Sequence, residues 1–160
     1  MFKLLLLAAL IPAVMLQNAD NSPHHEWSAA RYTQCKGGQP MPRAVRIENC
    51  PGDVCDLRRG SNANMALDFT ASAVSSTLRV TATAYVFGIA VPYELPSNIA
   101  NACVWLDRAR CPIDQGEELS YILEFPIGHM YPAISLEIEI SLLDDASNSQ
   151  ACFKIQAQVV

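Results

Sequence analysis

The sequence predicts an all-β fold, an antiparallel β-sandwich of two sheets. Short segments alternate between apolar and polar side chains with the two-residue period of a half-buried strand. Turn-forming residues separate these segments, and no segment after the N-terminal apolar run repeats its apolar residues at the helical period. The 160 residues contain no repeat or linker that would divide them, so a single domain is expected.

The alternation places six strands. The clearest is 134–142, where aliphatic residues alternate with serine and glutamate. In chain order the expected strands cover residues 44–48, 65–70, 78–86, 119–125, 134–142 and 153–159. Each has one apolar face, the pattern of an antiparallel sheet that packs one face on a core and exposes the other.

Residues 85–96 are a candidate functional segment. It predicts the end of a strand that runs into a turn held open by Pro92 and Pro96, because proline fixes φ and lacks a backbone donor. Gly88 indicates a bulge or a close backbone approach. Tyr93 lies between the prolines on a rigid, partly exposed support. The stretch fits the rim of a ligand pocket, or an ordinary strand exit with a surface tyrosine.

The strand at 78–86 has small residues at the centre of its apolar face. Ala82 and Ala84 lie between bulkier residues on that face. If no large side chain of the opposite sheet fills the space, a hydrophobic cavity remains between the sheets. The alternative is a close-packed core in which a neighbour such as Phe69 covers the alanines.

Residues 1–19 are expected to be a secretory signal peptide, which leaves 20–160 as the mature domain. Lys3 precedes an apolar run at 4–16 that is interrupted by Pro12. The run is shorter than the ~20 apolar residues that span a bilayer. The mature protein is therefore expected to be soluble and secreted.

All six cysteines lie in the predicted mature domain, and an even number in an exported chain predicts disulfide bonds. Spacing favours two local pairs and one long-range pair: Cys50–Cys55, Cys103–Cys111 and Cys35–Cys152. The long-range bond would close a loop of ~100 residues, worth roughly 4–5 kcal/mol in the chain-entropy model. Zinc is the competing interpretation, but the sequence has no Cys-x-x-Cys pair or Cys/His cluster.

Charge and motifs exclude several classes of function. Asp and Glu number 16 against 11 Lys and Arg, and Arg58–Arg59 is the only adjacent basic pair, so no nucleic-acid-binding face is expected. The familiar nucleophile, phosphate-loop and metalloprotease motifs do not occur. Asp144 and Asp145 are interpreted as solvated turn charges. We therefore expect no catalytic residue, no metal, no cofactor and no enzymatic activity.

A fixed order of short motifs resembles one known family. The motifs are Cys50-Pro51, Asp68-Phe69-Thr70, Gly88-Ile89-Ala90-Val91-Pro92, Cys111-Pro112, Phe125-Pro126-Ile127, Tyr131-Pro132, Leu143-Asp144-Asp145 and Cys152-Phe153. With six cysteines in register, residues 35–160 resemble the Niemann–Pick type C-two family of small secreted sterol carriers. That family belongs to the lipid-recognition (ML) domains, which also include the group-two mite allergens.

The resemblance implies an immunoglobulin-like sandwich with a lipid held in a hydrophobic cavity between the sheets, and it agrees with the disulfide pairing above. It places Tyr93, Ile127 and Tyr131 at the mouth of the pocket. The full set of predicted ligand-binding residues is Tyr93, Ile127, Tyr131, Val91, Phe69 and Ile140. Three positions depart from the cholesterol carriers of the family. Tyr93 replaces Phe, Glu94 replaces Pro, and Ile140 replaces a Trp, so the identity of the ligand stays open.

The expected function is lipid transport without chemistry. We expect a monomer that binds a sterol, a fatty acid or another small hydrophobic ligand and contacts a membrane or a membrane-bound acceptor transiently during delivery. Its expected location is extracellular or the endosome–lysosome lumen. The alternatives are innate-immune recognition of microbial lipid, transport of semiochemicals or fatty acids, and a structural sandwich that binds no ligand.

Overall fold

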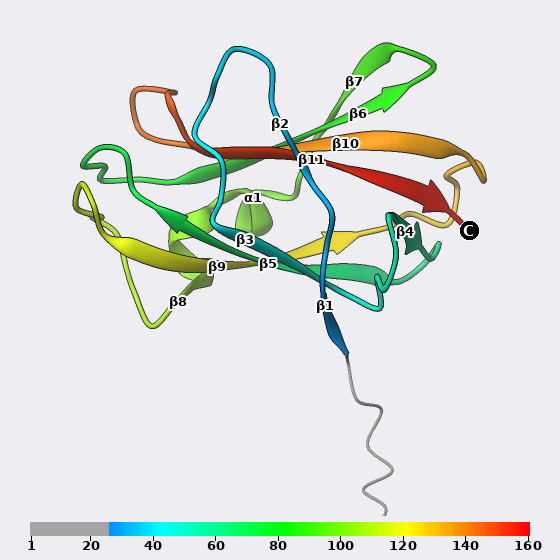
Figure 1. The fold of residues 1–160 in the computed structure, drawn as a ribbon, viewed down its shortest axis with the longest axis horizontal. Coiled ribbons are helices and arrows are strands. Elements are labelled where there is room, and N and C mark those ends of the chain that lie inside the picture. The colour runs from blue at the N-terminus through cyan, green and yellow to red at the C-terminus, as the bar shows by residue number, and fades with distance from the viewer. Residues whose placement is uncertain (1–25) are drawn as a thin grey trace, which may run out of the picture.

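The computed structural model describes residues 26–160, which form two packed β-sheets (Figure 1). The predicted signal peptide, residues 1–19, lies outside the described residues. One sheet has the spatial order β1 (Trp27–Ala29), β3 (Ala44–Glu48), β5 (Asn62–Thr70), β9 (Glu118–Pro126) and β8 (Leu106–Asp107). The other has the order β2 (Thr33–Gln34), β11 (Ser149–Val159), β10 (Ser135–Leu143), β6 (Arg79–Val86) and β7 (Ile89–Tyr93), with β4 (Val54–Leu57) also beside β11.

The sandwich is antiparallel, as predicted, apart from β4, which runs parallel to β11. The six strands expected from alternation are present as β3, β5, β6, β9, β10 and β11. Alternation did not indicate the shorter strands β1, β2, β4, β7 and β8. A one-turn helix α1 (Ser97–Ala100) and a 3-10 turn η1 (Ala102–Trp105) lie between β7 and β8. None of the helices within residues 26–160 is both long enough and apolar enough to cross a membrane.

The prediction of an open turn after residue 86 is wrong. β6 and β7 form a tight hairpin through Phe87 and Gly88, whose φ angles of 50° and 81° suit the right-handed twist of the flanking strands. Gly88 thus provides a positive φ rather than a bulge or a close approach. Pro92 lies inside β7, paired with Thr83. It is tolerated there because β7 is an edge strand with a neighbour on one side only.

The core lies between the sheets and consists of the inward-facing residues of both. Alternate residues of β9 are buried, which confirms the face assigned to it from the sequence, whereas residues 150–155 of β11 are buried on both faces. Large side chains that are almost completely buried come from both sheets and include Leu67, Phe69, Tyr121, Leu123, Val80, Ile140, Leu142 and Phe153.

The three disulfide bonds are those that the cysteine spacing favoured. Cys35–Cys152 joins the end of β2 to β11 across a separation of 117 residues. Cys50–Cys55 and Cys103–Cys111 close local loops. No cysteine in residues 26–160 is free.

The turn that follows β10 differs from its prediction as solvated charge. Asp144 is buried, and its carboxylate accepts hydrogen bonds from the backbone N–H groups of Ala146 and Asn148 at 3.0 and 2.7 Å. The side-chain amide of Gln150 donates a third, at 3.2 Å. Asp144 therefore organises the turn between β10 and β11, because its short acceptor pairs donors that the turn leaves free.

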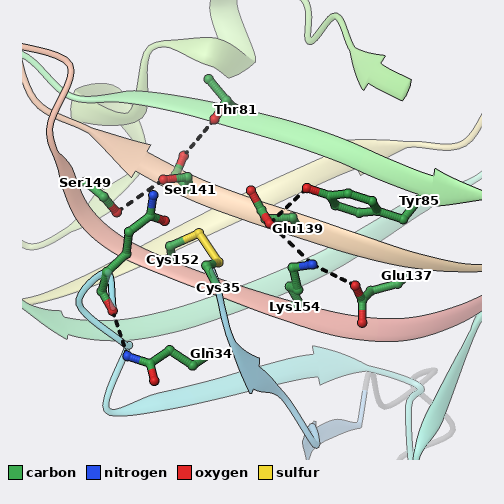
Figure 2. The surroundings of a disulfide bond; sticks show 11 residues. Gln34, Cys35, Thr81, Tyr85, Glu137, Glu139, Ser141, Ser149, Cys152 and Lys154 are labelled. Atoms are coloured by element: carbon green, nitrogen blue, oxygen red, sulfur yellow. Dashed lines mark hydrogen bonds and ion pairs between the residues drawn. A yellow bond between two sulfur atoms is a disulfide. The ribbon is translucent and has the colours of Figure 1, made fainter. Parts of the chain in front are cut away.

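The outer face of the second sheet carries an ionic cluster, drawn in Figure 2 beside the Cys35–Cys152 bond. The buried amine of Lys154 lies 2.8 Å from a Glu137 carboxylate oxygen, 3.6 Å from a Glu139 oxygen and 4.1 Å above the centre of the Tyr85 ring. The hydrogen bond with Glu137 raises the pKa of Lys154. The cluster connects β6, β10 and β11, whose opposite faces line the cavity described next.

Candidate functional site

An apolar cavity of about 180 Å³ lies between the end of β9 and the second sheet. The residues that line it are spread along the chain from Leu57 to Val159. They are Leu57, Ala82, Ala84, Val86, Val91, Pro92, Tyr93, Phe125, Ile127, Tyr131, Pro132, Ile134, Leu136, Ile138 and Val159. No acidic or basic side chain is among these described residues, so the wall is built to hold an apolar molecule.

The cavity confirms the space expected from the small residues of β6. Ala82 and Ala84 both line it, and Phe69 does not fill it. Phe69 pairs with Leu119 near the end of β5, whereas the cavity lies at the Phe125 end of β9. The large aromatic therefore packs at the far end of the first sheet, and the alanines face open space.

Tyr93 connects the two sheets at the mouth of the cavity. Its ring lies 4.7 Å from that of Phe125 and 6.1 Å from that of Tyr131, measured between centres. Its hydroxyl donates a hydrogen bond to the carbonyl of Pro126 at 2.9 Å. Burial, followed by the neighbouring Tyr131 hydroxyl, raises the pKa of Tyr93 to about 12. The phenol is thus uncharged at physiological pH and acts as a donor.

Backbone hydrogen bonds hold Ile127 against the cavity. Its N–H donates to the carbonyl of Ser61 at 2.8 Å, and its carbonyl accepts from the N–H of Gly60 at 2.7 Å. Gly60 has a φ of 76°, and a side chain there would collide with the ring of His129. The glycine therefore allows the segment after β9 to pack closely on the loop before β5, with Ile127 buried.

Four of the six predicted ligand-binding residues line the cavity together. They are Val91 and Tyr93 of β7, and Ile127 and Tyr131 of the segment between β9 and β10. Phe69 and Ile140 are fully buried in the core and do not line it. Ile140 pairs with Ala82 and Phe153 across the sheet, one inward position beyond Ile138, the last residue of β10 in the lining.

Several residues that line the cavity were not predicted from the sequence. Leu57 and Val159 meet through the parallel pairing of β4 with β11, which alternation does not reveal. Ile138 could have been found, because it lies on the apolar face of the clearest strand and pairs with Ala84. The missing information was the register between β10 and β6.

Large apolar side chains around this mouth are exposed to solvent. Phe87 is 92% exposed at the tip of the β6–β7 hairpin, and Met130 is 97% exposed between β9 and β10. Ile89 and Val91 of β7 are also exposed. In Figure 1 the hairpin splays away from the sandwich at the end where the C-terminus lies. We call Phe87, Ile89, Val91 and Met130 the apolar rim.

Comparisons with known proteins agree with this architecture. The family model of the ML domain matches residues 29–159. The NPC intracellular cholesterol transporter 2 of Canis lupus familiaris is 26% identical over 131 residues, which are 82% of this chain and 85% of that protein.

Two solved structures share the fold. A Niemann–Pick type C2 protein from the Japanese carpenter ant superposes with a TM-score of 0.72 at 22% identity, over 81% of this chain and 99% of the ant protein. Chicken MD-1 complexed with lipid IVa gives a TM-score of 0.51 at 16% identity, over 78% of this chain and 85% of MD-1. Because the family model spans nearly the whole described sandwich, the chain belongs to the ML-domain family of lipid-recognition proteins, which are not enzymes.

Proposed function

We propose that this protein is a secreted carrier that holds a sterol, or a hydrophobic molecule of similar size, between its two sheets and delivers it. The observation that carries the proposal is the uncharged, apolar cavity with an aromatic mouth. Transport by the dog relative, named for cholesterol, and the lipid bound to chicken MD-1 support a lipid ligand. The absence of cationic side chains from the described lining favours a neutral lipid over an anionic lipid A-like ligand.

The energetics suit a carrier that binds by burial alone. A ligand that buries ~300–400 Å² of apolar surface gains about 7–10 kcal/mol at ~25 cal/mol/Å² before the costs of association. The present cavity of about 180 Å³ is smaller than the ~300–1,000 Å³ typical of ligand pockets. A sterol therefore requires the cavity to widen, and the side chains at its mouth are the ones that must move.

Ile127→Glu tests the proposed pocket. The carboxylate would face the apolar body of the ligand, and an unpaired charge in such surroundings costs several kcal/mol or forces the group to take up a proton. We expect displacement assays with a fluorescent sterol and a fluorescent fatty acid to show at least a roughly tenfold loss of affinity. Tyr93→Ala and Tyr131→Ala should lose less, because they remove contact area without adding a charge.

A matched control lies on the strand that precedes Ile127. Ile122 is 37% exposed, on the opposite face of β9, so Ile122→Glu should bind both probes like the wild type. Thermal melts of the two variants separate lost binding from lost folding. Wild-type binding by a folded Ile127→Glu protein would show that the ligand lies elsewhere. Preferential binding of an anionic lipid A-like molecule by the wild type would support immune recognition instead.

A further inference from the structure

The hydrogen bond between Tyr93 and Pro126 is the polar feature of an otherwise apolar cavity. Among the described residues that line it, only Tyr93 and Tyr131 carry polar side-chain atoms. The Tyr93 hydroxyl reaches across from β7 to the carbonyl at the end of β9, so the bond ties one sheet to the other. Its ring packs between Phe125 and Tyr131, and the Tyr131 hydroxyl neighbours that of Tyr93.

A ligand that enters by this mouth must push the Tyr93 ring aside and break that bond. The Tyr93 donor and the Pro126 acceptor are then left facing the ligand. A hydrocarbon surface pairs neither group, and an unpaired polar group in an apolar site is costly. A carboxylate or sulfate only accepts hydrogen bonds, so it cannot satisfy the carbonyl, and the described lining offers no cation for it.

A ligand hydroxyl meets both requirements, because it has one donor and two acceptor positions. It can donate to the Pro126 carbonyl and accept from the Tyr93 phenol, so it replaces the broken bond by two. The phenol remains protonated for this purpose across the neutral and acidic range, since its pKa is about 12.

We propose that Tyr93 and the Pro126 carbonyl form a recognition site for the hydroxyl end of a neutral lipid alcohol, which makes Tyr93 the residue that selects the polar end of the ligand. This inference rests on the proposed carrier function and narrows its ligand class. The ligand lies with its apolar body against Ala82, Ala84 and Ile138, and with its hydroxyl at the mouth.

Tyr93→Phe is the decisive variant, because it keeps the ring that packs on Phe125 and removes the hydroxyl alone. Displacement of the neutral dye N-phenylnaphthylamine is measured with two matched series. One is cholesterol, cholestene and cholesterol sulfate; the other is oleyl alcohol, octadecene and oleate. Tyr131→Phe is the comparison variant, since it removes the lining hydroxyl that neighbours Tyr93 and keeps both partners of the Tyr93–Pro126 bond. Thermal melts confirm that each variant is folded.

We expect the wild type to prefer each alcohol over its hydrocarbon and its anion. Tyr93→Phe should lower the preference for the alcohol over the hydrocarbon by roughly threefold to tenfold, the effect of one net hydrogen bond. Hydrocarbon affinity should hold or improve, and Tyr131→Phe should change the ratio less. An unchanged ratio in folded Tyr93→Phe, or a wild type that binds the anion most tightly, would overturn the inference. Failure of the wild type to bind the dye and both series would instead refute the carrier function.

Discussion

Two tyrosines of this sandwich show how surroundings decide what a hydroxyl does. Tyr93 donates to Pro126 at the mouth of the cavity. Tyr121 is completely buried on β9, and none of the described residues pairs with its hydroxyl. Burial raises the pKa of Tyr121 well above its ordinary value. A buried hydroxyl without a partner costs free energy, so the Tyr121 hydroxyl lowers the free energy of unfolding.

Tyr121→Phe should therefore stabilise the protein or leave its stability unchanged. Removing an unpaired hydroxyl while keeping the ring is expected to raise the free energy of unfolding by about 1 kcal/mol. Tyr32→Phe is the control, because the Tyr32 hydroxyl donates to the carbonyl of Pro42 at 3.2 Å and its loss should destabilise. Urea titration of both variants measures the difference. A loss in Tyr121→Phe as large as that in Tyr32→Phe would mean that the hydroxyl is paired.

Asp68 should make stability depend on acid. Two hydrogen bonds from Arg46 are the main reason that the pKa of Asp68 is lowered, and the Ser120 hydroxyl contributes a third bond. A carboxyl whose pKa is lower in the folded state stabilises the fold above its unfolded pKa of about 3.9. That stabilisation is lost as the pH falls through this value toward the folded one.

Asp68→Asn removes this contribution. We expect the variant to be less stable than the wild type at about pH 7, and we expect the gap to narrow as the pH falls below about 3.9 toward the lowered pKa of Asp68 in the folded state. Urea midpoints at both pH values provide the measurement. A constant gap between the two proteins at every pH would contradict the assignment.

At the scale of whole elements, alternation worked where a strand is long and one of its faces is buried. β10 and β11 have many consecutive alternating residues, so each strand could be predicted from its own sequence, without knowledge of the strands that pair with it. β2 has two residues, and its pairing with Phe153 and Lys154 of β11 defines it more than its own sequence does. The β6–β7 hairpin was missed because the rule against proline in central strands does not apply to an edge strand.

The candidate site was predictable to the same extent. The family resemblance placed Tyr93, Ile127 and Tyr131 at the mouth, and all three line the cavity. Leu57 and Val159 depend on β4 pairing in parallel with β11, and Phe69 depends on which end of the sandwich stays open. Both are properties of strand register, which a single sequence does not contain.

The Cys35–Cys152 bond should be the main covalent stabiliser of these elements. It connects β2 to β11 over 117 residues, whereas Cys50–Cys55 spans 5. The chain-entropy model gives roughly 4–5 kcal/mol for a loop of ~100 residues and roughly 2 kcal/mol for a very short one. Alanine at both Cys35 and Cys152 should therefore lower the free energy of unfolding more than alanine at both Cys50 and Cys55. Equal losses in chemical denaturation would indicate that local packing, not loop closure, decides the effect.

At the scale of the molecule, polar and apolar surfaces are divided between the face and the end of the sandwich. The Lys154 cluster covers the outer face of β6, β10 and β11. The apolar rim surrounds the mouth at the end of the same strands. A carrier that meets a membrane by this end would bring the opening of its cavity to the acyl chains.

The apolar rim is expected to be the contact surface for delivery to membranes. Phe87→Ser and Met130→Ser should slow the transfer of a fluorescent sterol to phosphatidylcholine vesicles by roughly threefold or more, because an apolar side chain that enters the interface gains free energy in proportion to its buried area. Neither side chain lines the cavity, so the affinity for the sterol should not change.

Val74→Ser is the matched control for this experiment. Val74 is 62% exposed, but it precedes β6, at the other end of that strand from Phe87, so its loss should leave the transfer rate unchanged. Transfer rates are measured by stopped-flow fluorescence at several vesicle concentrations. Delivery by direct contact makes the rate rise with vesicle concentration. If the rates of the rim variants match the wild type, or if no rate depends on vesicle concentration, the sterol leaves through water and the rim has another use.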